Sequence, residues 1–119
     1  MRDNVKGGAL TETTFFILLS LYKPNHGYGI MQFIENETAG RLSLGAGTLY
    51  GAINTLLKKG WIRLYNDDTH IHDSDVRKKE YLITEQGKRI SETELKRLNE
   101  VYIIADKIIG GNRNDNKEV

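Results

Sequence analysis

The sequence of 119 residues predicts a mainly α-helical domain that carries a small β-hairpin and continues into one long C-terminal helix. Three observations predict this fold class. Apolar residues recur at helical spacing in three segments before residue 60. Two alternating, aromatic-rich segments follow, and the polar interval between them is typical of a hairpin. From residue 84 to residue 109, an apolar stripe extends further than one small core can cover.

The first two predicted helices are short and are separated by a proline. Residues 1–9 are polar and contain glycine, so we expect a flexible arm. A helix is predicted over residues 10–22, with Thr11 or Thr13 at its start, and the Lys-Pro-Asn that follows should end it. A second, amphipathic helix is predicted over residues 26–37.

The third predicted helix carries the surface that most directly indicates a function. It follows Ser43, a candidate N-cap, and ends at Gly60, which suits a left-handed C-cap. Its apolar face consists of Leu49, Ile53, Leu56 and Leu57. Opposite them lie Thr48, Gly51, Thr55 and Lys58. An outward face that is small, polar and positive can enter the major groove of DNA, so this helix predicts a DNA-binding regulator.

A hairpin is expected after the third helix. Its strands are predicted at residues 61–65 and 79–84, and the interval of residues 66–78, rich in Asp, Asn and Ser, should be an exposed loop. Three helices followed by a hairpin is the order of elements in a winged helix-turn-helix domain. We assign residues 10–84 to that domain.

The C-terminal helix should extend beyond the domain. A helix of about 25 residues spans nearly 40 Å, so part of its apolar stripe needs a partner, and a second copy is the simplest one. We therefore assign residues 85–110 to a dimerisation helix. Gly110 and Gly111 are expected to end it, and residues 111–119 are expected to form a disordered tail.

Composition excludes several classes of protein and leaves the charge pattern as the useful signal. The net charge is only +1, but no acidic residue lies between Glu37 and Asp67, whereas four basic residues do. Cysteine is absent, which excludes disulfides and thiolate metal sites. No apolar run reaches the length of about 18 to 20 residues that a membrane span needs, so we expect a cytoplasmic protein without a membrane partner.

No motif predicts an enzyme, a cofactor or a metal site. The sequence lacks a Gly-x-Ser-x-Gly elbow, a phosphate-binding Gly-x-x-x-x-Gly-Lys-Ser/Thr loop and a His-Glu-x-x-His pair. His70 and His72, among the aspartates of the predicted loop, could in principle bind a metal. Without supporting residues around them, we interpret this segment as a hydrophilic loop.

Four short motifs occur in order along the predicted domain. They are Gly27-Tyr28-Gly29-Ile30, Gly47-Thr48-Leu49-Tyr50, Lys59-Gly60-Trp61-Ile62 and Tyr81-Leu82-Ile83-Thr84-Glu85-Gln86-Gly87. Together they resemble the pattern of PadR-like transcriptional regulators, in the shorter subfamily with a single C-terminal helix. The resemblance implies a homodimeric, usually repressing, DNA-binding protein whose operator affinity is lowered by a small molecule. Gly51 departs from the pattern, since proline is common there.

Nine residues are candidates for contact with double-stranded operator DNA. They are Ser43, Thr48, Tyr50, Gly51, Asn54, Lys58, Arg77, Lys78 and Lys79. Hydroxyl groups can donate to phosphates or base edges, asparagine can pair with adenine, and lysine or arginine can neutralise phosphates. The alternatives are that Tyr50 packs on the hairpin, that Asn54 only solvates the helix, and that the three basic residues at the base of the wing are a solvated charge run.

A second group of apolar residues is predicted to form a dimer seam that could also take a small aromatic or amphipathic effector. They are Phe15, Phe16, Leu19, Leu95, Leu98, Val101, Tyr102, Ala105, Ile108 and Ile109. Met31 is a further candidate for the lining of an effector cavity. Simple dimer packing is the alternative for any one of these residues. The alternative for the whole protein is a winged-helix module for protein assembly that has no operator, which would explain the near-neutral charge.

Overall fold

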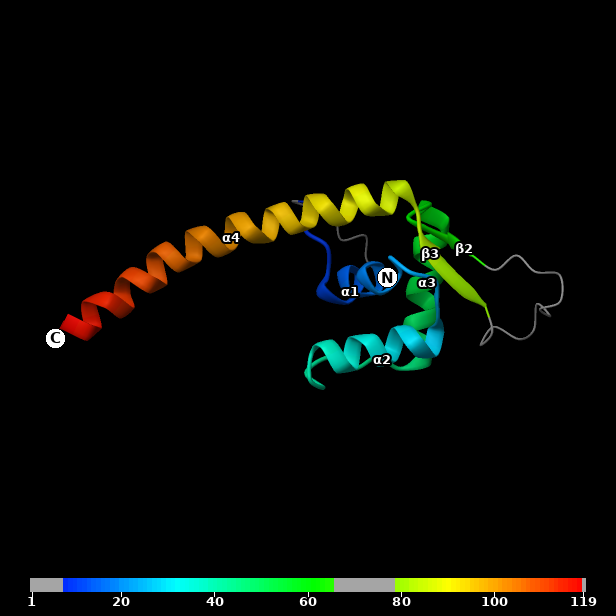
Figure 1. Ribbon diagram of the computed structural model, residues 1–119, viewed down its shortest axis with the longest axis horizontal. Helices are drawn as coiled ribbons and strands as arrows, with labels where there is room; N and C mark the ends of the chain where they lie inside the picture. Colours follow the sequence, from blue (N-terminus) through cyan, green and yellow to red (C-terminus); the bar gives the residue numbers. More distant parts are fainter. Residues whose placement is uncertain (1–7, 66–78, 119) are drawn as a thin grey trace.

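The computed structural model describes residues 8–65 and 79–118, with side chains as far as residue 111. Three helices come first: α1 (Glu12–Ser20), α2 (Gly27–Glu37) and α3 (Ala46–Lys59). A short strand, β1 (Asn25–His26), lies between α1 and α2. The strands β2 (Ile62–Leu64) and β3 (Glu80–Ile83) precede the long helix α4 (Glu85–Glu118). Helices α1, α2 and α3 lie beneath the first turns of α4, which then extends away from them (Figure 1).

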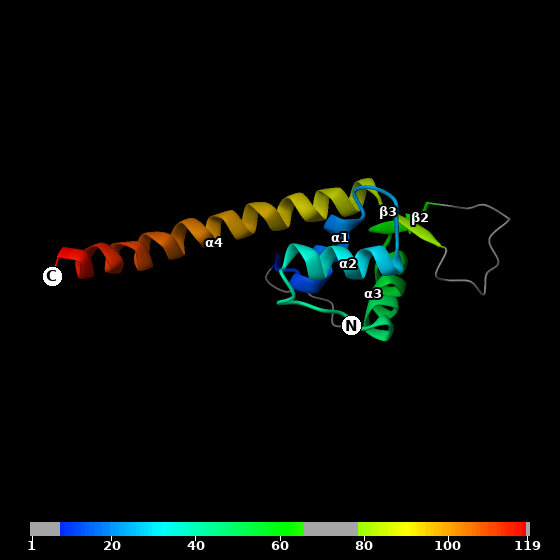
Figure 2. The same ribbon diagram turned by 60° about the horizontal axis from the view of Figure 1, so that its bottom comes forward.

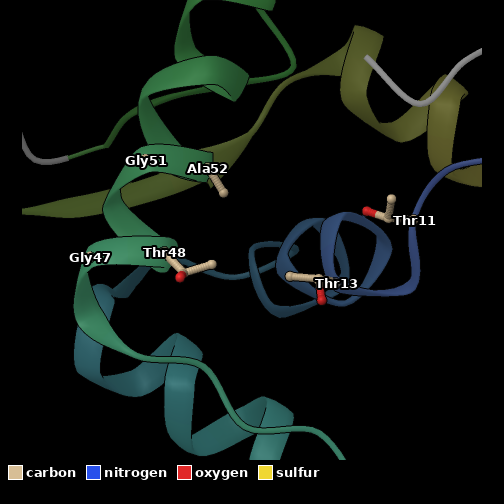
Figure 3. A pocket seen from close by; sticks show the side chains of 6 residues that line it. All are labelled: Thr11, Thr13, Gly47, Thr48, Gly51 and Ala52. Carbon is tan, nitrogen blue, oxygen red and sulfur yellow. The ribbon is translucent and has the colours of Figure 1, made fainter. Parts of the chain in front are cut away.

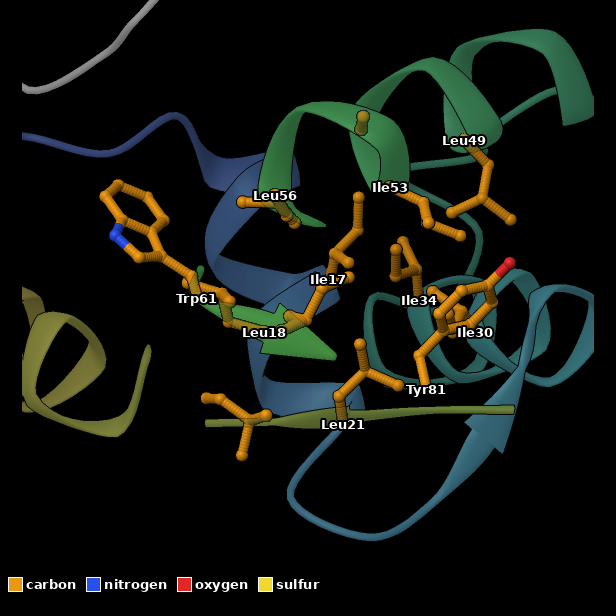
Figure 4. Close-up of a cluster of buried hydrophobic side chains, with 13 residues drawn as sticks. Ile17, Leu18, Leu21, Ile30, Ile34, Leu49, Ile53, Leu56, Trp61 and Tyr81 are labelled. Atoms are coloured by element: carbon orange, nitrogen blue, oxygen red, sulfur yellow. The ribbon is translucent and has the colours of Figure 1, made fainter. Parts of the chain in front are cut away.

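The core forms where the apolar faces of α1, α2, α3 and the sheet meet (Figure 4). Ile17 and Leu18 of α1 are fully buried, as are Ile30 and Ile34 of α2. From α3, the core receives the face predicted to be apolar, with Leu49, Ile53 and Leu56 buried. Burial of each such side chain contributes on the order of 1.5–3 kcal/mol, so this packing fixes how α3 is oriented on the domain.

The predicted hairpin is confirmed, but the sheet has a third strand that the sequence did not predict. β3 lies in the centre, with β2 antiparallel on one side and β1 antiparallel on the other. β1 is two polar residues long and pairs Asn25 with Tyr81 and His26 with Glu80. Two residues are too few to show an alternating pattern in the sequence. The strand forms because these residues pair with β3 in the folded structure.

Local capping explains most helix boundaries. Thr11 caps α1, where its hydroxyl accepts from the backbone N–H of Thr14 at 3.2 Å. His26 caps α2 through Nδ1, which accepts from the N–H of Gly29 at 3.0 Å. Gly60 ends α3 with φ of 76°, as predicted for a left-handed C-cap.

Two predictions about helix ends are wrong. Ser43 does not cap α3, because the N-cap is Gly45 and no side chain bonds there. The long helix does not end at Gly110 and Gly111, since α4 continues through both to Glu118. A glycine inside a helix costs only about 1 kcal/mol relative to alanine and meets no steric obstacle, so two glycines need not end a helix. No helix in residues 8–65 or 79–118 is long and apolar enough to cross a membrane.

Candidate nucleic-acid interface

A line of exposed residues runs along the outward side of α3, and none of them is acidic. Gly47, Gly51, Asn54 and Lys58 follow one another at spacings of three and four residues and are all exposed. An added Cβ at Gly47 or Gly51 would meet no atom within 4 Å, so the helix backbone itself is open to a large partner there. The last turn carries Lys58 and Lys59, where cations also interact favourably with the helix dipole.

A hollow of about 420 Å³ separates this line from the start of α1 (Figure 3). On α3 it is lined by Gly47, Thr48, Gly51 and Ala52, and on the α1 side by Thr11 and Thr13. In Figure 3 the threonine side chains lie on either side of the space between the two helices. The structure therefore brings the predicted Thr48 and Gly51 together with two threonines that the DNA-contact prediction did not include.

Tyr50 does not lie on the exposed line. Its side chain is half-buried, and its hydroxyl lies so close to Gly27 that a Cβ there would collide with it. Burial, together with the nearby Tyr50, raises the pKa of Tyr81. Tyr50 thus packs between α2 and the sheet, which favours the packing alternative for this residue.

Ser43 also lies apart from that line. Its hydroxyl donates to Oε2 of Glu35 on α2 at 3.3 Å. It lines a separate hollow of about 250 Å³ together with Tyr28, Met31, Gln32, Glu35 and Leu44. Met31 therefore lines a different hollow from the one lined by the predicted seam residues Phe15 and Phe16.

The wing contributes one basic residue on β2 and another just before β3. Lys79 lies half-exposed just before β3. Arg63 is exposed on β2, where its Nη1 donates to the carbonyl of Leu64 at 3.1 Å. Arg63 was not among the predicted contact residues, although it lies in the acid-free stretch of the sequence. Arg77, Lys78, His70 and His72 lie outside the described residues.

The predicted seam residues of α1 meet the beginning of α4. Phe15, Phe16, Leu19 and Leu98 line one hollow of about 350 Å³. Its other lining residues are Leu10, Glu12, Glu94 and Arg97. The distal part of α4 continues past this hollow with large apolar side chains exposed, among them Val101, Tyr102, Ile108 and Ile109. Ala105 is half-buried, and Leu95 is exposed at the edge of the same face.

A buried acid at this hollow was missed by the sequence analysis. Glu94 is only 2% exposed and binds Arg97 through two hydrogen bonds of 2.9 and 2.6 Å. Its Oε1 also accepts from the backbone N–H of Leu10 at 3.3 Å. The bonds to Arg97 lower the pKa of Glu94 more than burial raises it. The spacing of three residues between Glu94 and Arg97 was a usable signal for the pair, but nothing in the sequence indicated burial of the acid.

Among the described residues, no group of three or more His, Cys, Asp or Glu side chains could hold a metal ion. The geometry instead offers two kinds of surface. One is an exposed polar and basic face on α3 and the wing, and the other is an apolar face on α1 and α4.

Comparison with known proteins agrees with this arrangement. Residues 17–93 match the transcriptional regulator PadR-like family. A transcriptional regulator from Clostridium thermocellum, Cth-833, is 22% identical, with a TM-score of 0.64 over 90% of this chain and 96% of that one. The protein smu.1704 from Streptococcus mutans UA159 is 25% identical, with a TM-score of 0.64 over 83% of this chain and 87% of that one.

One similar structure contains DNA. Bacillus subtilis PadR in complex with operator DNA is 21% identical, with a TM-score of 0.59 over 81% of this chain and 60% of that one. No curated protein gave a significant match. The family match covers more than half of the 119 residues, and the helices and sheet have the winged-helix arrangement. The chain therefore belongs to the PadR-like family of transcriptional regulators.

Proposed function

We propose that this DNA-binding regulator is a homodimeric repressor that reads a pseudo-palindromic operator with α3 and releases it when a small aromatic or amphipathic compound binds at the dimer seam. The observation that carries the proposal is the exposed line on α3. Gly47 and Gly51 have no side chain that would keep the helix away from DNA. Asn54 can pair with a base edge, and Lys58 can neutralise a phosphate. The complex of Bacillus subtilis PadR with operator DNA supports this use of the fold.

Dimerisation is supported by the shape of α4. Helix α4 comprises 34 residues, about 51 Å at 1.5 Å per residue, while the domain beneath it covers only its first turns (Figure 2). The face that turns Glu94 and Leu98 toward α1 continues along the helix through Val101, Ala105 and Ile108. A second copy would cover this apolar face of α4.

A symmetric dimer presents two α3 helices. Each must enter a major groove on the same side of the duplex, so the half-sites should lie about 10 base pairs, or a multiple of this, apart. An effector that binds between the subunits would change operator affinity only by its differential affinity for the two separations of the α3 helices. The hollow lined by Phe15, Phe16 and Leu98 supports an apolar effector at this position.

The salt dependence of binding to mixed-sequence DNA tests the proposal. The protein should bind at low salt, with log affinity falling linearly as log salt concentration rises. Lys58→Ala should weaken binding to every sequence and reduce the magnitude of the slope by about 0.9, because one phosphate contact is lost. Lys88→Ala, at the start of α4, is the matched control and should leave the slope unchanged. No binding by the unmodified protein at low salt would instead support an assembly module without an operator.

A further inference from the structure

Among the described residues, one basic side chain, that of Arg41, lies on the side of α3 that faces α1. In the described segments α1, α2 and residues 38–45, which connect α2 to α3, Arg41 is the sole lysine or arginine. The same segments carry Glu12, Glu35 and Glu37. The opposite side of α3 has Arg63 and Lys79 of the wing. Among these described segments, Arg41 is therefore the one basic residue on the α1 side of α3, whereas the wing side has two.

Glu12 forms a bidentate ion pair with the guanidinium group of Arg41. Nη1 of Arg41 donates to Oε1 of Glu12 at 3.0 Å, and Nη2 donates to Oε2 at 2.5 Å. This two-pronged pair is exposed, with 61% of the Arg41 side chain and 48% of the Glu12 side chain accessible. It joins the first turn of α1 to the connection that leads into α3, and the threonines on either side of Glu12 line the hollow facing Thr48.

The position of this pair matters once α3 lies in a groove. The major groove is about 12 Å wide, close to the diameter of a helix with its side chains, so a phosphate backbone runs along each side of the bound helix. One backbone would pass the wing, and the other would pass the edge formed by the start of α1 and the connection before α3. A phosphate offers Arg41 the same two-oxygen geometry that Glu12 now offers.

Resting on the proposed function, we propose that Arg41 is a further contact to the DNA backbone and that Glu12 competes with phosphate for it. When the ion pair opens, the guanidinium of Arg41 can bind a phosphate, and the carboxylate of Glu12 becomes hydrated. Exposed ion pairs stabilise little, so the competition should reduce DNA affinity by only about two- to five-fold. Glu12 then acts as a built-in limit on non-specific binding.

Four variants test this proposal in salt titrations on one mixed-sequence duplex. Arg41→Gln should weaken binding and reduce the magnitude of the salt slope by about 0.9. Glu12→Gln should tighten binding by about two- to five-fold. In Glu12→Gln/Arg41→Gln, the tightening should vanish, because Glu12 acts through Arg41. Glu37→Gln removes an equal charge from the end of α2 and should change affinity less than Glu12→Gln does.

The outcomes separate this inference from the proposed function. If the unmodified protein fails to bind DNA, the proposed function itself fails. If the protein binds but Arg41→Gln leaves the slope unchanged, Arg41 is not a phosphate contact and the inference is wrong. Equal tightening by Glu12→Gln with and without Arg41 would also overturn it, since that result means general charge repulsion. Thermal melting of each variant identifies any loss of binding that comes from unfolding.

Discussion

At the scale of single residues, the junction between α3 and α4 is held by a few short contacts. The hydroxyl of Thr84 donates to the carbonyl of Gly60 at 2.7 Å, and the N–H of Thr84 donates to the carbonyl of Trp61 at 3.0 Å. The same hydroxyl accepts from the N–H of Gly87 at 3.1 Å, in the first turn of α4. The end of α3 is therefore hydrogen-bonded directly to the residues that begin α4.

Gly87→Ala should destabilise the protein. A Cβ at this position would collide with the carbonyl oxygen of Trp61, and backbone has little room to move, so we expect a loss of about 1–3 kcal/mol or more in the free energy of unfolding. Urea denaturation followed by circular dichroism measures the change. Gly51→Ala is the matched control: it faces open space and should be neutral or stabilising by up to about 1 kcal/mol. Equal stability of the two variants would contradict this account of the junction.

Glu94 should make stability depend on pH in the acid range. Its pKa in the folded protein is lowered from the ordinary value of 4.5, chiefly by hydrogen bonds from Arg97, so the folded state favours the charged form. The stabilisation is complete above the ordinary pKa and is lost as pH falls through the lowered value. Glu94→Gln should therefore be less stable than the unmodified protein at pH 7, with the difference shrinking toward pH 3. The prediction is refuted if the difference in free energy of unfolding between the two proteins stays the same from pH 7 to pH 3.

At the scale of elements, α4 carries two different surfaces along one face. Near α1 the face is closed by packing, with Ser91 and Glu94 buried. Beyond Leu98 the same face is open, and its large apolar side chains are about half exposed or more. Such a continuous apolar surface on a projecting helix is typical of an interface.

Ile108→Glu should break the proposed dimer while leaving the domain folded. Ile108 is 61% exposed in a single subunit, so the charge costs the isolated chain little, but it would be buried unpaired against a partner. Sedimentation velocity at micromolar concentration should show a shift from dimer to monomer. Ile103→Glu places the same change on another face of α4, where Ile103 is 53% exposed, and should remain dimeric. The dimer seam is misassigned if both variants, or neither, dissociate.

The sequence predicted those elements whose signals are local. The apolar face of α3, the cap at Gly60 and the hairpin strands followed from periodicity and glycine chemistry. β1 and the packing of Tyr50 against Gly27 could not be predicted in the same way, because both depend on contacts between segments distant in the sequence. The position of Ser43 could not be predicted either, since α3 begins only after Gly45 and the Ser43 hydroxyl bonds to Glu35 of α2.

The candidate site was predictable to a similar extent. Thr48, Gly51, Asn54 and Lys58 could be placed on one side of a helix from their spacing. The hollow that joins Thr48 to Thr11 and Thr13, and the ion pair between Glu12 and Arg41, require the three-dimensional arrangement of α1 beside α3. Patterns within a helix therefore predicted the exposed face of α3, and packing between helices placed α1 beside it.

At the scale of the whole molecule, the fold is elongated. Its principal extents are 67, 27 and 24 Å, and α4 runs along the long axis (Figure 1). Because α3 is joined to α4 through Thr84 and Gly87, a change in how two α4 helices cross in the proposed dimer should move both α3 helices. Operator affinity in the proposed dimer thus depends on the geometry of its seam.

Footprinting on genomic fragments selected by the purified protein tests the central claim most directly. The account predicts protection of two half-sites of inverted sequence, centred about 10 base pairs or a multiple apart, by one dimer on one side of the duplex. Ile108→Glu should lose the paired footprint, while Ile103→Glu should keep it. No enrichment of any fragment, or protection of a single unpaired site by a monomer, would contradict the claim that two copies read DNA together.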